Sequence, residues 1–185
     1  MFILHTNFIH YIRKMDYYAA GILPYIKIEN KTYFLLGKDK RNKWSDFGGK
    51  SELKDNNSPK NTAIREFFEE TSGCISTLYK TAHVLHGKNV TCLKGKSYTK
   101  KDYYMYLVNL EYLISKNYLD SSIQNFNKHH KFLKNSNIDP KYIEKLNLSL
   151  ISIDLMYDKS AINNLRQVFY NTVNIECNKN IIMCV

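Results

Sequence analysis

The sequence predicts a single domain of the α/β (α+β) class, and three observations lead to this prediction. Its 185 residues suit one domain with a full-sized core. Its hydrophobic share of 44% and charged share of 24% are typical of a globular protein. Strand-like and helix-like segments follow one another in the order β-β-α-β-β-(α)-β-α, with no repeat and no linker between them.

The first 14 residues, MFILHTNFIHYIRK, precede a second methionine, Met15, at which the domain-like pattern begins. Their basic residues follow the apolar ones, which is the reverse of a secretory signal. We therefore expect an N-terminal extension over 1–14 and one domain over 15–185. No apolar run approaches the roughly 20 residues that cross a bilayer, so no membrane association is predicted.

The first half of the domain contains a predicted hairpin followed by a helix. Residues 17–28 (YYAAGILPYIKI) and 32–39 (TYFLLGKD) are rich in β-branched and aromatic residues and are separated by a turn. A polar loop then leads to a helix that starts at Ser58 as N-cap and Pro59 as first residue. Gly73 is the expected C-terminal stop of this helix.

In the second half of the domain, strands and helices are predicted to follow one another less regularly. Its expected elements are strands at 74–87 and 102–113 around a basic loop at 88–101, a weakly helical region at 121–146 with a turn at Asp139-Pro140, a short strand at 148–155 and an amphipathic helix at 160–175.

Charge and cysteine usage indicate the kind of partner and the compartment. The formal net charge is +10, which favours polyanionic partners such as nucleotides or RNA, although lysines spread evenly over the surface would give the same total. The four cysteines form no CxxC pair and read as reduced thiols. We therefore expect a cytoplasmic protein, which for a viral protein would be the host cytoplasm.

The predicted helix carries an unusual group of acids. Glu66, Glu69 and Glu70 share one face at i, i+3 and i+4, and Arg65 precedes Glu69 by one turn. Such a face is either a solvated acidic patch or a site where Mg²⁺ or Mn²⁺ holds a diphosphate, because hard cations prefer carboxylate oxygens. Arg65 can orient Glu69 through a charge-assisted hydrogen bond.

The surroundings of this helix favour the second interpretation. The segment from Trp44 to Lys50 (WSDFGGK), followed by a loop and REFFEETSG, resembles the Nudix box, G-x5-E-x7-R-E-U-x-E-E-x-G-U. Gly49 opens the box and residues 65–70 match R-E-U-x-E-E in full. The tight match covers residues 44–74, and the order of elements is similar to that of Nudix proteins over about residues 16–175.

Three departures from the box concern its loop and its end. The position of the first glutamate is occupied by Asp55 or by Glu52, or remains unfilled, because nine residues rather than seven separate Asp55 from Arg65. We place a two-residue insertion near Asn56-Asn57, ahead of the helix, where a loop absorbs extra length at little cost. The closing glycine, Gly73, comes one residue late.

The resemblance implies an α/β/α sandwich on a mixed central sheet and hydrolysis of a phosphorus-containing acid anhydride, in a nucleoside diphosphate linked to a group X. It also implies that Glu66, Glu69 and Glu70, with the backbone at Gly49, bind Mg²⁺ or Mn²⁺. Glu66 or a later glutamate would deprotonate the attacking water, and Arg65 would hold the catalytic carboxylates. Lys50 and Trp44 are the implied substrate-binding residues.

Glu144 is the candidate for the later glutamate, because it precedes the strand-like Leu150-Ile151-Ser152-Ile153. The alternative is a helix-surface glutamate paired with Lys141 or Lys145. For His129-His130 we expect solvated histidines rather than a metal site. Tyrosines 103, 104 and 106 have strand spacing and should be core plus one edge, with base stacking as the alternative.

Two Lys-rich loops, at 38–43 and 94–101, favour a highly anionic substrate, although each is ordinarily a solvated turn. The candidates are capped or triphosphorylated RNA, a diphosphoinositol polyphosphate, a (d)NTP and a dinucleoside polyphosphate. The sequence is also loosely similar to Nudix proteins of giant DNA viruses, some of which remove RNA caps. The alternative function is a non-catalytic Nudix-like module that binds nucleotide or RNA, which should have lost at least one of the three carboxylates.

Overall fold

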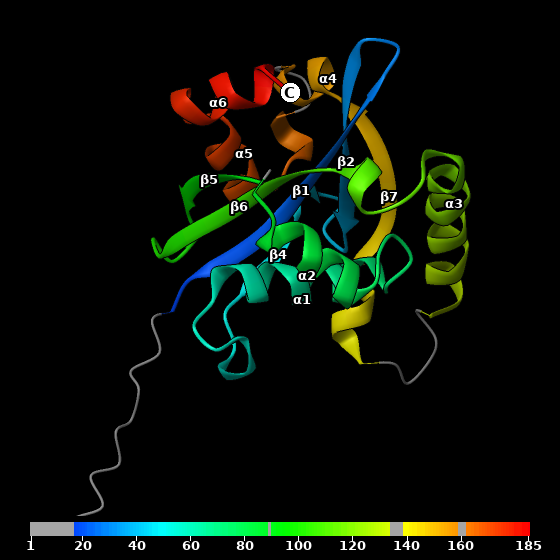
Figure 1. Ribbon diagram of the computed structural model, residues 1–185, viewed down its shortest axis with the longest axis horizontal. Helices are drawn as coiled ribbons and strands as arrows, with labels where there is room; N and C mark the ends of the chain where they lie inside the picture. The colour runs from blue at the N-terminus through cyan, green and yellow to red at the C-terminus, as the bar shows by residue number, and fades with distance from the viewer. Residues whose placement is uncertain (1–16, 89, 134–138, 159–161) are drawn as a thin grey trace, which may run out of the picture.

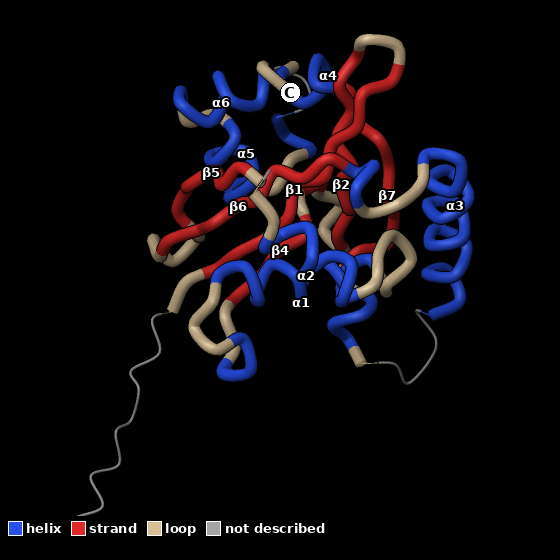
Figure 2. Tube along the Cα trace, viewed as in Figure 1, coloured by secondary structure: helices blue, strands red, loops and turns tan. Residues whose placement is uncertain are grey.

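The computed structural model describes residues 17–88, 90–133, 139–158 and 162–185. The extension predicted at 1–14 lies outside them. Figure 1 shows one sheet with helices on both of its sides, and Figure 2 separates the strands from the helices by colour. The strands are β1 Ala19–Ile28, β2 Lys31–Asp39, β3 Trp44–Ser45, β4 Phe47–Lys50, β5 Thr91–Lys96, β6 Asp102–Asn109 and β7 Lys145–Ser152. The helices are α1 Pro59–Thr71, α2 Leu78–His86, α3 Lys116–Leu133, α4 Ile153–Tyr157, α5 Gln167–Val173 and α6 Glu176–Met183.

Strand β1 is the centre of the sheet. Its first half pairs with β4 and its second half with β2, both antiparallel, while its other edge pairs with β6 in parallel. The sheet continues from β6 to β5 and from β2 to β7 and β3. The parallel β1–β6 pair among antiparallel ones makes the sheet mixed, as predicted.

Two hydrophobic cores lie on opposite faces of this sheet. Ala63, Ile64 and Phe67 of α1 pack on one face, and Phe67 meets Phe47 of β4 edge-on at 5.3 Å between ring centroids. Phe169 and Val173 of α5 pack on the other face. Side chains alternate along β1, so Ala20 and Ile22 belong to the core on the α1 face, whereas Ala19 and Leu23 belong to the core on the α5 face. The predicted α/β/α sandwich with a mixed sheet is confirmed.

The predicted hairpin and the first helix agree with the structure. Tyr25–Ile28 of β1 pair with Lys31–Phe34 of β2. Ser58 is the N-cap of α1, and its hydroxyl accepts a hydrogen bond from the backbone N–H of Asn61 at 3.3 Å. The helix ends at Thr71, and Ser72 and Gly73 follow in left-handed conformations with φ of 49° and 67°.

The strand predicted at 74–87 is wrong, because this segment forms α2. Thr77 caps the helix by accepting a hydrogen bond from the N–H of Lys80, and Thr81 and Leu85 are buried one turn apart. The loop predicted at 88–101 is also wrong over residues 91–96, which form β5. In β5, Leu93 and Gly95 are buried while lysines on either side are exposed, which is the period of a half-buried strand.

The C-terminal prediction needs three corrections. The strand predicted at 148–155 is β7, which begins at Lys145 and gives way to α4 at Ile153. The predicted helix at 160–175 is shorter, because Leu165 bridges to Trp44 and only residues 167–173 form α5. The helix α6 was not predicted; Asn178 fixes it by donating hydrogen bonds to the carbonyls of Thr172 and Lys94.

The remaining predictions hold with shifted ends. The weakly helical region predicted at 121–146 overlaps α3, which begins earlier, at Lys116, and a short 3-10 helix, Pro140–Ile143, forms the turn expected at Asp139-Pro140. The strand expected at 102–113 is β6, which ends at Asn109 before a 3-10 turn, Leu110–Tyr112. Within the described residues, none of the helices is long and apolar enough to span a membrane.

Candidate functional site

The three glutamates of α1 lie against the edge of β4 and are nearly buried. The side chains of Glu66, Glu69 and Glu70 are 12%, 9% and 1% exposed. A solvated acidic patch would leave them in water, so these exposures exclude the first interpretation offered by the sequence. Three carboxylates held together in the protein require cationic partners or a bound cation.

Arg65 supplies part of this compensation and connects the helix to the preceding loop. Its guanidinium donates to Glu66 at 2.7 Å and to Glu69 at 3.1 Å from one nitrogen, Nη1. The other two nitrogens form a two-point contact with Asp55, at 2.9 and 3.0 Å. Nη2 also donates to the backbone carbonyl of Lys50 at 2.8 Å. Arg65 therefore fixes α1, the loop and the end of β4 relative to one another.

The structure distinguishes the two acidic candidates that precede the helix. Asp55 is buried and also accepts hydrogen bonds from the Thr62 hydroxyl and the Glu52 backbone, both at 2.8 Å. Glu52 is half exposed and only approaches Arg65, at 3.3 Å. Asp55 is thus the carboxylate that braces Arg65. Asn56 and Asn57 follow it with φ of 55° each, and this left-handed pair accommodates the two extra residues of the loop.

Glu70 is held from two sides at the bottom of the site. Its Oε2 accepts the backbone N–H of Gly48 at 2.8 Å, and its Oε1 lies 3.4 Å from the ammonium group of Lys145. Lys145 is fully buried and also donates to the Ser45 hydroxyl at 2.6 Å and to the Asp46 carbonyl at 2.9 Å. The burial of this lysine is not predictable from local sequence, because a lysine at the start of a strand is ordinarily exposed.

Burial raises the pKa values of two of these carboxyl groups. Burial is the largest cause for Glu66, Arg65 opposes it, and the charges of Glu69 and Glu144 raise the pKa further, to about 7. Burial also raises the pKa of Glu70, although the charge of Lys145 lowers it. In both groups the raised pKa comes mainly from burial, which disfavours the charged carboxylate.

Gly49 brings the backbone of β4 against the helix. A methyl group at this position would lie 2.6 Å from the carboxyl carbon of Glu66, which is closer than side chains approach one another. Only glycine therefore lets Glu66 lie at the strand edge.

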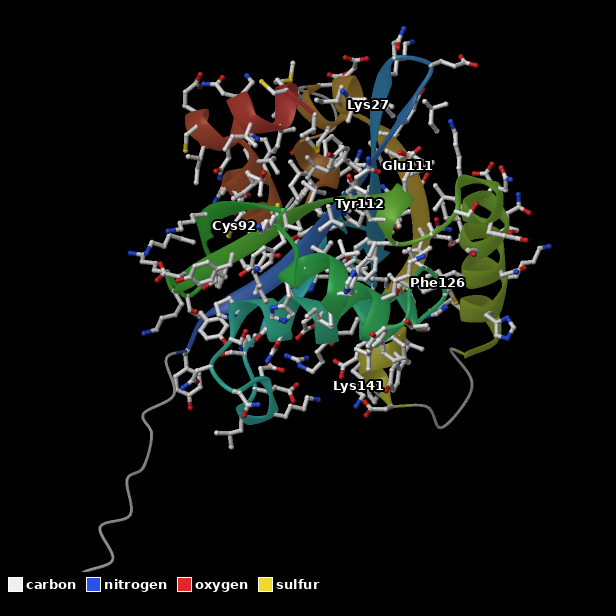
Figure 3. All side chains as sticks on the ribbon, in the orientation of Figure 1. Lys27, Cys92, Glu111, Tyr112, Phe126 and Lys141 are labelled. Atoms are coloured by element: carbon white, nitrogen blue, oxygen red, sulfur yellow. The ribbon has the colours of Figure 1, made fainter. Side chains whose placement is uncertain are left out.

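Glu144 lies near this cluster. It is exposed at the end of the 3-10 helix, yet it is close enough for its charge to raise the pKa values of both Glu66 and Glu70. The two lysines that could have paired with it bind other carboxylates: Lys141 contacts Asp139 at 3.1 Å and Glu69 at 3.8 Å, and Lys145 contacts Glu70. Figure 3 shows Lys141 below the centre of the molecule, at the end where α1 lies.

The two predicted substrate-binding residues lie in different surroundings. Lys50 ends β4, and its side chain is exposed beside a cavity on the α5 face of the sheet. Trp44 is half-buried in β3, where it packs against the core of that face, and the Lys38 ammonium lies 5.5 Å from its ring centroid. Lys50 therefore faces a space that a substrate could enter, whereas Trp44 packs into the fold.

The histidine prediction is half wrong. His129 is exposed, but His130 is buried, stacks on Phe126 at 3.8 Å and hydrogen-bonds the carbonyl of Tyr142 at 2.8 Å. Figure 3 shows Phe126 on the side of α3 that faces the sheet. His130 thus ties α3 to the segment that leads to Glu144 and Lys145.

Tyrosines 103, 104 and 106 lie as predicted, in the core and at its edge. Tyr103 and Tyr106 are buried, and Tyr104 is half-buried with its ring edge-on to Tyr18 at 6.0 Å. The Tyr103 hydroxyl donates a hydrogen bond to the buried Asp46 carboxylate. Of the Lys-rich loop expected at 94–101, only the tip of the β5–β6 hairpin lies outside the strands. Near this tip the Lys96 ammonium pairs with the Asp102 carboxylate at 2.6 Å.

Comparison with known proteins gives results at the level of structure alone. No protein-family model matches the sequence, and no curated protein is similar to it. A protein of Listeria monocytogenes assigned to the Nudix hydrolases is 16% identical, with 90% of this chain and 95% of that chain covered and a TM-score of 0.47. The Nudix domain of Shewanella oneidensis NrtR, solved with ADP ribose, is 9% identical over 89% of this chain and 86% of that chain, with a TM-score of 0.49.

A Caenorhabditis elegans Ap4A hydrolase is 15% identical, with 90% of this chain and 96% of that chain covered and a TM-score of 0.44. In fold, the chain is similar to Nudix hydrolases and Nudix domains. Likeness at these identities and TM-scores carries no argument about function. We therefore base the functional proposal on the residues of α1 and β4.

Proposed function

We propose that this chain is a metal-dependent pyrophosphohydrolase of the Nudix type, which cleaves the diphosphate of a nucleoside diphosphate linked to X. The observation that carries this proposal is the burial of Glu66, Glu69 and Glu70, with the Glu66 carboxylate packed against Gly49. Burying three carboxylates in one helical turn is unfavourable unless a cation shares them. Their spacing, together with Arg65, is that of the Nudix box.

The donor set fits a hard divalent cation such as Mg²⁺ or Mn²⁺. Carboxylate oxygens of Glu66, Glu69 and Glu70 and the backbone carbonyl of Gly49 would hold it. Such an ion, when bound, neutralises a diphosphate and lowers the pKa of a coordinated water.

Among the described residues, no three His, Cys, Asp or Glu side chains form a ready-made metal cluster, and cationic side chains contact Glu69 instead. Lys54 and Lys141 make these contacts at 3.5 and 3.8 Å, and both are more than one-third exposed. At Oε1 of Glu69, metal binding therefore requires only these two long, solvent-accessible ion pairs to open, which costs little.

The chain's own residues have separate tasks in this proposal. Arg65, braced by Asp55, holds Glu66 and Glu69 in position. Glu66 or Glu144 accepts the proton of the attacking water. Lys50, at the end of β4, contacts the anionic substrate, and the sequence assigned the same task to Trp44.

The proposed substrate is highly anionic. The net charge of +10 supports this, because a basic surface concentrates anions near the site. Capped or triphosphorylated RNA, a diphosphoinositol polyphosphate, a (d)NTP and a dinucleoside polyphosphate all satisfy the requirement. If RNA is the substrate, binding should weaken steeply as salt increases.

One observation favours the alternative of a non-catalytic nucleotide- or RNA-binding module. Lys145 already supplies a cation to Glu70 at 3.4 Å, as a protein that does not bind metal could do. Retention of all three carboxylates favours the enzyme, since a binding module has no use for them.

The test is cleavage of the diphosphate, with the two phosphorylated products separated by ion-exchange chromatography, for a panel of capped RNA, diphosphoinositol phosphate, NTP, dinucleoside polyphosphate and nucleotide sugar, with and without Mg²⁺ or Mn²⁺. We expect metal-dependent turnover of an anionic substrate and a loss of at least about 100-fold in Glu69→Gln. Glu111→Gln is the matched control, because Glu111 is exposed in the turn after β6, away from α1 (Figure 3). Binding without turnover would favour the alternative, and turnover unaffected by Glu69→Gln would refute the metal assignment.

A further inference from the structure

A cavity of about 510 Å³ lies on the α5 face of the sheet, beside β4. This volume is within the range of small-molecule sites, roughly 300–1,000 Å³. Ala19, Leu165 and Phe169 form apolar parts of its lining, and all three are buried. Apart from Lys50, the function proposed above assigns no role to the residues that line this cavity.

Strand β4 connects the cavity with the glutamates. Successive residues of a strand point to opposite faces, so Gly49 faces Glu66 on α1 while Gly48 faces Tyr103 on the cavity side. The backbone N–H of Gly48 points from the strand edge to Glu70. Only the edge of β4 therefore lies between the glutamates and the cavity. A substrate with its diphosphate at the glutamates could reach across this edge and place its X group in the cavity.

Among the charged side chains that line the cavity, cationic ones outnumber acidic ones. Four are cationic, namely Arg41, Lys43, Lys50 and Arg166, and two are acidic, namely Asp39 and Asp46. The side chains of Arg41 and Lys50 form no ion pair with any described residue. Arg166 reaches a carboxylate only at 3.8 Å, where its Nε approaches Asp39.

Both acidic side chains already have partners. Asp39 accepts the backbone N–H groups of Arg41 and Lys43 at 2.8 and 3.0 Å, which fixes the turn that carries Arg41. Asp46 accepts the hydroxyl of Tyr103. The cations therefore outnumber the acids, and the acids are engaged, so an anionic ligand would relieve the repulsion among the cations.

From this geometry we infer that the cavity binds the X group, that X carries a phosphate of its own next to an apolar ring, and that Arg41 and Arg166 select it. The inference rests on the proposed function. The apolar lining fits the face of a nucleobase, and the two guanidinium groups fit phosphate oxygens. X is therefore itself a nucleotide, rather than an uncharged sugar or a polyhydroxylated inositol ring.

The experiment compares two substrates that share an ADP moiety. In diadenosine tetraphosphate the group beyond the ADP is a nucleotide, whereas in ADP-ribose it is an uncharged sugar. The measured quantity is the ratio of their kcat/KM values in the wild type and in the variants Arg41→Gln and Arg166→Gln. Lys27→Gln is the control with the same change in charge. Lys27 is exposed eight residues along β1 from Ala19, roughly 26 Å away at the rise of a strand.

We expect the wild type to favour diadenosine tetraphosphate by at least about tenfold, and each arginine variant to lower the ratio about tenfold, equivalent to about 1.4 kcal/mol. Lys27→Gln should change it less than about twofold. A ratio unchanged in both arginine variants, or a wild type that prefers ADP-ribose, overturns the inference while the proposed function stands.

If no substrate is hydrolysed, the proposed function fails and the cavity is judged by affinity alone. Isothermal titration with diadenosine tetraphosphate in Mg²⁺ should then give a Kd about tenfold weaker in each arginine variant than in Lys27→Gln. Equal Kd values in all variants would overturn the assignment of the cavity.

Discussion

The two faces of the sheet differ in charge and in how their residues come together. On the α1 face, buried carboxylates gather within one turn of a helix, and Arg65 and Lys145 hold them. On the α5 face, cations that outnumber the acids line a cavity whose residues come from β1, the β2–β3 turn, β4, the β5–β6 hairpin and the start of α5. Strand β4 separates the two faces. The comparison suggests that the acidic face acts on the diphosphate and that the cationic face selects what is attached to it.

The strongest effect is expected where the acidic face is most deeply buried. Lys145→Met removes the ammonium group beside Glu70 and leaves a buried carboxylate without its cation. We predict a loss of about 3 kcal/mol in the free energy of unfolding, measured by urea denaturation. The double variant Lys145→Met/Glu70→Gln should recover part of this loss, because the uncompensated charge is then absent. A double variant less stable than the single one would contradict this account of Glu70.

A smaller effect is expected at the brace of Arg65. Burial would raise the pKa of Asp55, but hydrogen bonds from Arg65, Glu52 and Thr62 lower it below the usual value of an aspartate. Asp55→Asn should therefore cost about 2 kcal/mol at pH 7, the size of a hydrogen bond to a charged group.

The sign of the pH dependence follows from this lowered pKa. The stabilisation is present above the unfolded pKa and is lost as the pH falls through the folded value, since protonated Asp55 no longer binds Arg65 as a charge. The stability difference between the wild type and Asp55→Asn, followed by denaturation from pH 7 down to pH 2, should shrink below about pH 4. A difference that grows towards low pH would contradict the proposed brace.

The smallest effect on stability is expected on the cationic face. Arg41 and Arg166 are exposed, so their substitution by Gln should change the free energy of unfolding by less than about 0.5 kcal/mol. Thermal unfolding of both variants would measure this. A loss as large as that of Asp55→Asn would show that these arginines stabilise the fold, and would remove the contrast between the two faces.

The difference between the faces also explains what the sequence could predict. The α1 face depends on contacts within a short stretch, so the cap at Ser58, the apolar stripe and the placement of Arg65 and Glu69 follow from helical spacing. The burial of Lys145 and the pairing of Asp46 with Tyr103 join residues 57 to 100 positions apart. Local periodicity carries no information about such contacts.

The errors in secondary structure have the same origin. The segment 74–87 contains β-branched residues in its first part, yet the Thr77 cap and packing against α1 make it helical from Leu78. The predicted helix at 160–175 is interrupted because Leu165 and Arg166 pair with Trp44 of β3. Helix α6 depends on hydrogen bonds from Asn178 to two distant carbonyls. In each case tertiary contacts outweigh the local propensity.

The central claim, that the buried glutamates beside Gly49 hold a divalent cation, is tested most directly by Mn²⁺ binding. Titration of the full chain with Mn²⁺, with free Mn²⁺ followed by electron paramagnetic resonance, measures affinity without turnover. We predict that Glu69→Gln and Glu70→Gln each weaken Mn²⁺ binding by at least about tenfold, about 1.4 kcal/mol, whereas Glu111→Gln leaves it unchanged. Equal Mn²⁺ affinity in the wild type and all three variants would contradict the claim.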